Sequence, residues 1–205
     1  EKKWANKIGT KHAVFCNSGS SANLLMLASL LESESELAKK VKVGSKVVVP
    51  ALAWATDLAP VMQLGFKPLI CDINLSDLSV DLNHLENLFI NESPSILILV
   101  SVLGLVPEME KIQALCNKYE VLLLEDACES SGSMYKGQNL GSFGLMGSFS
   151  TYFGHHISTI EGGFVCTNDE ELYEILKQSI DSTGLPVMNT SQFVAAVDKF
   201  GKEDF

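Results

Sequence analysis

Residues 95–126, SILILVSVLGLVPEMEKIQALCNKYEVLLLED, contain two aliphatic runs separated by an amphipathic segment. The runs at 95–100 and 121–126 are almost free of polar residues, which is typical of strands buried on both faces. The segment between them predicts a helix over 107–119 with one apolar face. That face consists of Met109, Ile112, Leu115 and Cys116. The order strand, helix, strand predicts two parallel strands joined by a crossover helix.

The same alternation continues toward the N-terminus. Residues 46–50 and 68–72 predict two more strands, again too apolar to be half-exposed. Helical patterns lie at 21–31, 56–64 and 81–90. The chain is therefore predicted to be an α/β protein with a mostly parallel central sheet. Ligands of such sheets bind at the carboxyl ends of the strands, where Trp54 and Asp126 are expected.

The composition narrows the classes of partner. The chain has 205 residues, of which 46% are hydrophobic and 20% charged, as in a globular protein with a sizeable core. A net charge of −10 argues against binding to nucleic acid or to an anionic membrane. No apolar run approaches the roughly 20 residues that span a bilayer, and the first residues lack the apolar core of a signal peptide. We expect a soluble, cytoplasmic protein.

Five cysteines are present and contain no C-x-x-C pair: Cys16, Cys71, Cys116, Cys128 and Cys166. Their odd number and mostly apolar surroundings predict buried, reduced thiols, as in a cytoplasmic protein. Zinc and iron–sulfur sites need clustered ligands, so we expect no metal site.

Residues 17–23, NSGSSAN, follow the strand-like run at 13–16 and precede a helical pattern. Small residues at a helix N-terminus let N–H groups and hydroxyls approach a phosphate. A Ser/Gly helix cap has the same sequence, so both interpretations stay open. The glycine fingerprints GxGxxG and GxxxxGK[ST] of nucleotide-binding loops are absent.

Trp54 and Asp126 each allow two interpretations. A carboxylate at the end of a buried strand is costly unless it is paired. Asp126 is therefore expected either to meet a helix cap or a lysine, or to keep a heterocycle nitrogen protonated. Trp54 is either a core residue or a platform that stacks on a planar cofactor ring.

Residues 148–163, SFSTYFGHHISTIEGG, contain two adjacent histidines. Neighbouring residues on a strand point to opposite faces, so His155 and His156 are not expected to bind one metal together. Taken alone, a histidine in this position is more often structural than catalytic.

Taken together, these segments resemble the DegT/DnrJ/EryC/StrS family of sugar-nucleotide aminotransferases, which are fold-type-I pyridoxal-phosphate enzymes. The resemblance runs from about Trp4 to Ser179, and its motifs are residues 17–22, 50–56, 125–129 and 148–163. It implies that residues 1–181 form the three-layer α/β large domain of that fold, incomplete at its N-terminus. Residues 182–205 would be a divergent or truncated segment that leads toward a largely missing C-terminal small domain. The Arg-x-His-Gly motif expected after Glu-Gly-Gly is not recognisable.

The resemblance implies pyridoxal 5'-phosphate, or its pyridoxamine form, as the cofactor. By position, Gly19, Ser20 and Ser150 would hold the phosphate. Trp54 would stack on the ring, and Asp126 would pair with the pyridine nitrogen.

Two further positions depart from the usual family pattern. Glu129 stands where aminotransferases of the family usually have a glutamine near the ring hydroxyl. His155 stands at the position of the lysine that bonds covalently to the cofactor aldehyde. An imidazole moves protons but cannot form that bond, so the exchange favours elimination over ordinary transamination.

The histidine resembles one branch of the family, the GDP-4-keto-6-deoxymannose 3-dehydratases of colitose biosynthesis. The resemblance implies that L-glutamate converts the cofactor to its pyridoxamine form, which attaches to the 4-keto group of a nucleotide sugar. His155 would then remove a proton, the C3 hydroxyl would leave and ammonia would be released. The implied enzyme is a homodimer, with GDP-4-keto-6-deoxymannose as the favoured substrate. The CDP-sugar 3-dehydratases also carry this histidine, but they use an iron–sulfur cluster.

Three other hypotheses remain. The chain could be a sugar aminotransferase that uses histidine atypically, or a non-catalytic member of the fold. A Rossmann dehydrogenase is disfavoured because the glycine fingerprint is missing.

Overall fold

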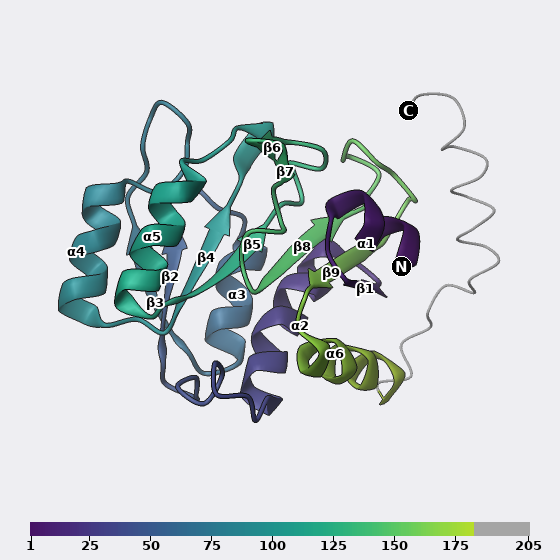
Figure 1. Ribbon diagram of the computed structural model, residues 1–205, viewed down its shortest axis with the longest axis horizontal. Coiled ribbons are helices and arrows are strands. Elements are labelled where there is room, and N and C mark those ends of the chain that lie inside the picture. The colour runs from purple at the N-terminus through teal and green to yellow at the C-terminus, as the bar shows by residue number, and fades with distance from the viewer. Residues whose placement is uncertain (183–205) are drawn as a thin grey trace.

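The computed structural model describes residues 1–182, which form three layers (Figure 1). The middle layer is a seven-stranded sheet with the strand order β1-β9-β8-β5-β4-β2-β3. Its strands are β1 (His12–Cys16), β2 (Lys46–Pro50), β3 (Lys67–Cys71), β4 (Ile96–Val100), β5 (Leu122–Asp126), β8 (Met146–Ser150) and β9 (Gly163–Thr167). A separate ribbon pairs β6 (Met134–Tyr135) with β7 (Gln138–Asn139). The predicted three-layer α/β fold is confirmed.

Helices cover both faces of the sheet (Figure 1). The helices are α1 (Lys2–Ile8), α2 (Gly19–Glu32), α3 (Ala55–Gln63), α4 (Leu82–Glu92), α5 (Met109–Tyr119) and α6 (Glu170–Ser182), with a short 3-10 turn at Val102–Gly104. The core on one face joins α2, α3 and α6 to Ile98 of β4. The core on the other face joins α1, α4 and α5 to Leu97 and Leu99. Because successive strand residues point to opposite faces, β4 is apolar throughout.

Six of the seven strands run in one direction. The contacts β3–β2, β2–β4, β4–β5 and β5–β8 are all parallel. β9 is antiparallel to both β8 and β1, so β1 points the same way as β8. The carboxyl ends of β1, β2, β5 and β8 therefore lie at one edge of the sheet, which we call the carboxyl edge.

Most predicted elements are confirmed to within two residues. The predicted strands at 46–50, 95–100 and 121–126 correspond to β2, β4 and β5, which are largely buried. The prediction that residues 68–72 are buried is wrong. β3 is an edge strand that pairs with β2 alone, and Ile70 is 49% exposed.

The cysteines are unpaired thiols, as predicted, and four of the five are buried. Burial raises the pKa of Cys16 and Cys166 to about 12, so these thiols stay protonated near neutral pH. Cys128 departs from the prediction because it is only half-buried, just beyond the end of β5.

The predicted boundary after residue 181 falls in the last turn of α6, which ends at Ser182. Residues 183–205, most of the segment expected to lead toward a second domain, lie outside the described residues. No helix in residues 1–182 is long and apolar enough to cross a membrane.

Candidate active site

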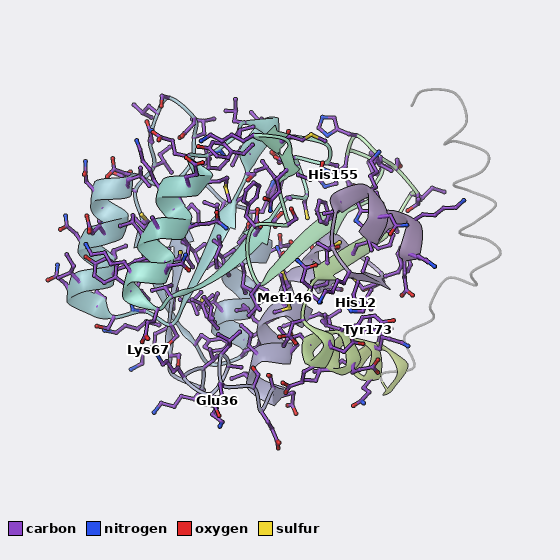
Figure 2. All side chains as sticks on the ribbon, in the orientation of Figure 1. His12, Glu36, Lys67, Met146, His155 and Tyr173 are labelled. Carbon is purple, nitrogen blue, oxygen red and sulfur yellow. The ribbon has the colours of Figure 1, made fainter. Side chains whose placement is uncertain are left out.

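The carboxyl edge carries all seven predicted site residues: Gly19, Ser20, Trp54, Asp126, Glu129, Ser150 and His155. Figure 2 shows His155 at the end of the molecule opposite Lys67, the first residue of β3. A cavity of about 410 Å³ lies at the other edge, beside Ser95 and Leu122, and contains none of the predicted residues. The fold therefore gathers four distant motifs into one region.

The start of α2 lies directly against the end of β8. A methyl group at Gly19 would lie 2.6 Å from Cβ of Ser150 and 2.9 Å from Sγ of Cys128. A larger residue would push the helix away from the strand, so this close approach requires glycine. Ser150 is buried, and its Oγ accepts a hydrogen bond from the N–H of Tyr152 at 3.2 Å. Ser20, the next residue of α2, is exposed.

Ser18 caps α2. Its Oγ accepts from the N–H of Ser21 at 3.1 Å, and its carbonyl accepts from the N–H of Ala22 at 3.0 Å. The N–H of Ser20 lies in the first turn and has no intrahelical partner. The helix-cap interpretation of residues 17–23 is confirmed, and the phosphate interpretation stays a prediction, with which a donor at the positive end of the helix dipole is compatible.

Asp126 ends β5 with its carboxylate buried, 6% exposed. Its Oδ2 accepts a hydrogen bond from Nδ2 of Asn23 at 2.6 Å, and its Oδ1 accepts from the N–H of Cys128 at 2.8 Å. In the part of the chain that the structure describes, no lysine pairs with Asp126 and it caps no helix. The expected structural partners are thus replaced by a side-chain amide and a backbone N–H.

A second carboxyl group, that of Asp57, lies beside Asp126 and is fully buried. Its Oδ1 accepts from Nδ2 of Asn23 at 3.0 Å, and its Oδ2 accepts from the N–H of Trp54 at 3.0 Å. Burial, followed by the negative charge of Asp126 and a hydrogen bond with it, raises the pKa of Asp57 from 3.8 to about 9. The direction of this shift favours the neutral form of Asp57 near pH 7.

The Trp54 side chain is 66% exposed, so the interpretation of Trp54 as a core residue is wrong. Its Nε1 donates to Oε1 of Glu129 at 2.9 Å. The other oxygen, Oε2 of Glu129, accepts from the N–H of Leu103 at 2.8 Å. Glu129 thereby holds the edge of the indole and leaves its ring available for stacking.

His155 lies in the loop between β8 and β9, not on a strand, and this corrects the strand assumed for the histidine pair. The base of the loop is closed by Thr151, whose N–H donates to the carbonyl of Gly162 at 2.9 Å. The buried hydroxyl group of Thr159 donates a hydrogen bond to the hydroxyl oxygen of Thr151 at 2.7 Å. The N–H of His155 donates to the carbonyl of Tyr152 at 3.0 Å, and the ring centroids of these two residues are 6.3 Å apart.

Two glycines bring this loop against the start of α2. Gly162 has φ of 144°, and a methyl group there would lie 2.5 Å from Oγ1 of Thr151. A methyl group at Gly163 would lie 2.4 Å from the carbonyl oxygen of Ser18. The Glu-Gly-Gly motif thus allows the histidine loop and the serine cap to pack together.

Sequence reasoning assigned no role to Asn23, Asp57 or Ser148. Two signals were available. Asp57 stands three residues after the N-cap Trp54, the usual position of an acid that bonds the cap N–H. Asn23 lies inside a helix, where asparagine is unfavourable unless its side chain has a specific partner. Among residues 1–182, no group of three or more His, Cys, Asp or Glu side chains could hold a metal ion.

This architecture is that of the large domain of fold-type-I pyridoxal-phosphate transferases: a mostly parallel sheet between helical layers, with its polar site at the carboxyl edge. The chain belongs to the DegT/DnrJ/EryC1/StrS aminotransferase family, whose sequence model matches residues 1–203.

Relatives with known names share the described region. The GDP-4-keto-6-deoxy-D-mannose 3-dehydratase of Yersinia pseudotuberculosis is 41% identical over 176 residues, which cover 86% of this chain and 44% of that protein. The enzyme of the same name from Escherichia coli O55:H7 is 38% identical over the same shares. A structure of the E. coli enzyme with bound hydrated pyridoxal phosphate matches with a TM-score of 0.81 and 37% identity, covering 86% of this chain and 44% of that one. The chain spans less than half the length of these relatives.

Proposed function

We propose that this chain is the cofactor-binding part of a sugar-nucleotide 3-dehydratase that uses pyridoxal 5'-phosphate. The enzyme would remove the C3 hydroxyl of a nucleotide-linked 4-keto-6-deoxyhexose. One observation carries the proposal. The loop after β8 brings His155 to the carboxyl edge, where Gly19, Trp54, Asp126 and Ser150 also lie, and we take His155 to stand at the family's lysine position.

Three features of the carboxyl edge fit this cofactor. The exposed indole of Trp54 matches a flat ring, because stacking would remove its apolar face from water. The single negative charge at Asp126 matches a protonated ring nitrogen. The contact of Gly19 with Ser150, beside the free N–H of the first turn of α2, matches a phosphate.

When bound, pyridoxal phosphate supplies an electron sink that stabilises negative charge on the adjacent carbon. Asp126 would keep the ring nitrogen protonated, and Trp54 would hold the ring plane. Glu129 accepts a hydrogen bond from the indole of Trp54 and would fix its position. Glu129 would also lie near the hydroxyl group of the cofactor ring. Gly19, Ser20 and Ser150 would hold the phosphate.

His155 would perform the proton transfers. Its half-buried imidazole, held on a loop closed by buried threonine hydroxyls, would accept a proton and return it to the departing C3 hydroxyl. A side chain without a primary amine cannot anchor the cofactor covalently. In its pyridoxamine form, the cofactor held by Trp54, Asp126 and Ser150 would supply an amine that no side chain at position 155 occupies.

The substrate and partners are proposed for the full-length protein. We take GDP-4-keto-6-deoxymannose as the favoured substrate, L-glutamate as the amino donor and a homodimer as the assembly, in the cytoplasm. The names of the two relatives at 38% and 41% identity support the nucleotide sugar.

The test is mass spectrometry of the products formed by the full-length protein with pyridoxal phosphate, L-glutamate and GDP-4-keto-6-deoxymannose. We expect a 3-deoxy-4-keto sugar and free ammonia. The variant His155→Lys should lose dehydration and trap the cofactor covalently, whereas His156→Lys is the matched control because His156 is the exposed neighbour. Undiminished dehydration in His155→Lys would refute the role of His155.

A conventional aminotransferase is the second candidate, and the family's aminotransferase members favour it. It predicts an amino sugar and no net ammonia. The same experiment separates the two reactions. Absence of any turnover would favour a non-catalytic member of the fold.

A further inference from the structure

One buried amide joins the two carboxyl groups at the carboxyl edge. Nδ2 of Asn23 lies 2.6 Å from Oδ2 of Asp126 and 3.0 Å from Oδ1 of Asp57. The three residues come from α2, β5 and α3, and all are buried. Two buried carboxyl groups bridged by one amide strongly disfavour the state in which both are ionised.

The orientation of the amide is set by a fourth residue. The Oγ of Ser148 in β8 donates to Oδ1 of Asn23 at 2.5 Å. This bond leaves both N–H groups of Asn23 directed at acceptors. The amide of Asn23 therefore donates to both acids. Exchanging its oxygen and nitrogen by a 180° rotation would break these two hydrogen bonds and the one from Ser148.

The surroundings decide which acid keeps the proton. Asp126 lies at the edge and accepts the shorter bond from Asn23, together with a second bond of 2.8 Å from the N–H of Cys128. Asp57 lies deeper, and its contact with Asn23 is longer. The titratable groups that act on Asp57 are Asp126, Glu129 and Cys128, and none of them is positive. The ionised form is therefore favoured at Asp126 and disfavoured at Asp57.

We propose that Asp57 and Asp126 act as one unit, with the shared proton on Asp57 and the charge on Asp126, bridged by Asn23. Asp57 is then a positioning residue that acts through Asn23 and Asp126. Its role is to keep one negative charge, at a fixed place, for the protonated ring nitrogen. This last role rests on the proposed function.

The direct test follows the carboxyl groups themselves. Carbon-13 NMR of the full-length protein labelled in aspartate, without added cofactor, should show one carboxyl group that titrates near pH 9. The signal should disappear in Asp57→Asn and remain in the control Asp72→Asn, whose side chain is exposed. In Asp126→Asn the same signal should shift to lower pH, because the neighbouring charge is gone. A signal assigned to Asp57 that titrates near 3.8 would overturn the proposal.

A second readout uses the bound cofactor. The absorbance of bound pyridoxal phosphate should show a step near pH 9 in the wild type, where Asp57 ionises, and no such step in Asp57→Asn. Asp126→Asn should weaken cofactor binding at pH 7 at least about tenfold more than Asp57→Asn, because it removes the charged partner. If Asp57 has only a structural role, the absorbance step near pH 9 should persist in Asp57→Asn, and that result would contradict the proposal.

The two hypotheses fail separately. A raised Asp57 titration with no cofactor binding would support the shared proton and overturn the proposed function. Cofactor binding together with an ordinary Asp57 titration would support the proposed function and overturn the shared proton.

Discussion

Glu125 and Asp126 are adjacent acids at the end of one strand, and both are buried, but they serve two different regions. Glu125 accepts hydrogen bonds from the backbone N–H groups of Gly141, Phe143 and Gly144 at 2.7, 2.6 and 2.7 Å. Asp126 accepts one side-chain and one backbone N–H and shares its surroundings with a second acid. Adjacent strand residues face opposite ways, so each carboxyl group meets a different set of neighbours.

The difference separates a structural acid from an acid prepared for a ligand. The donors around Glu125 belong to one rigid turn and satisfy its carboxylate completely. Asp126 has two donors and lies at the sheet edge beside Asp57, where we propose that it meets a protonated ring nitrogen. The arrangement of donors, rather than burial alone, distinguishes the two roles.

The largest effect is expected from Glu125→Ala. This change leaves one buried and two half-buried N–H groups without their acceptor, at about 1–3 kcal/mol each, so unfolding should become easier by at least about 3 kcal/mol. Urea denaturation followed by circular dichroism measures the loss. Glu110→Ala, at an exposed site, is the control and should change the midpoint little. Unchanged stability in Glu125→Ala would contradict the structural assignment.

Asp126→Asn should instead reduce activity. Turnover by the full-length enzyme should fall by about 10²–10³-fold, the usual loss when one preorganised electrostatic partner is removed. The stability loss should be smaller than that of Glu125→Ala, because Asp126 accepts two hydrogen bonds where Glu125 accepts three, and the amide keeps one acceptor oxygen. Steady-state kinetics and urea denaturation test both statements. A variant with full turnover would eliminate the distinction between the two acids.

The pH dependence of stability should separate the two regions further. Burial raises the pKa of Glu125 from 4.5 to about 7, although its three backbone donors lower it, and the pKa of Asp57 is raised to about 9. Both folded-state pKa values exceed the unfolded ones. The stability contributed by each group is therefore complete below its unfolded pKa and lost as pH rises through its folded pKa.

The free energy of unfolding should thus fall between about pH 5 and 9, by at most about 1.4 kcal/mol per pH unit for each group. Glu125→Gln should flatten the slope below pH 7, and Asp57→Asn should flatten it up to about pH 9. Denaturation series at fixed ionic strength provide the comparison. A stability that rises over this range would contradict both pKa shifts.

The smallest effect is expected from Glu129→Gln. The two oxygens of Glu129 each accept one hydrogen bond, from Trp54 and from Leu103, whereas the amide has a single oxygen and can replace only one of these acceptors. The free energy of unfolding should therefore fall by about 0.5–1 kcal/mol. Trp54 fluorescence should change because its Nε1 loses a charged acceptor, while the contribution of Trp4 is common to both proteins. Identical spectra would show that the carboxylate does not hold the indole.

Several elements could be predicted because their pattern is local. β4 is apolar at every position and β5 at its first three, and α5 buries Met109, Ile112 and Cys116 as its spacing predicts. β3 has the same aliphatic pattern as these strands but lies at the edge, because periodicity does not record which strands are neighbours. The pattern also misplaced His155 on a strand, because the turn after Ser150 depends on Thr151, Thr159 and Gly162.

Local patterns in the sequence were enough to predict the alternation of strands and helices and the order of four family motifs, and they carry the prediction that His155 stands at the family's lysine position. Only the tertiary structure decided that Gly19 lies against Ser150, that Trp54 is exposed, and that Asp57 shares its surroundings with Asp126. The physical reason is that charge, burial and hydrogen bonding act through space. The side chains of Asn23, Asp57 and Asp126 come within hydrogen-bond distance only when α2, α3 and β5 are packed together.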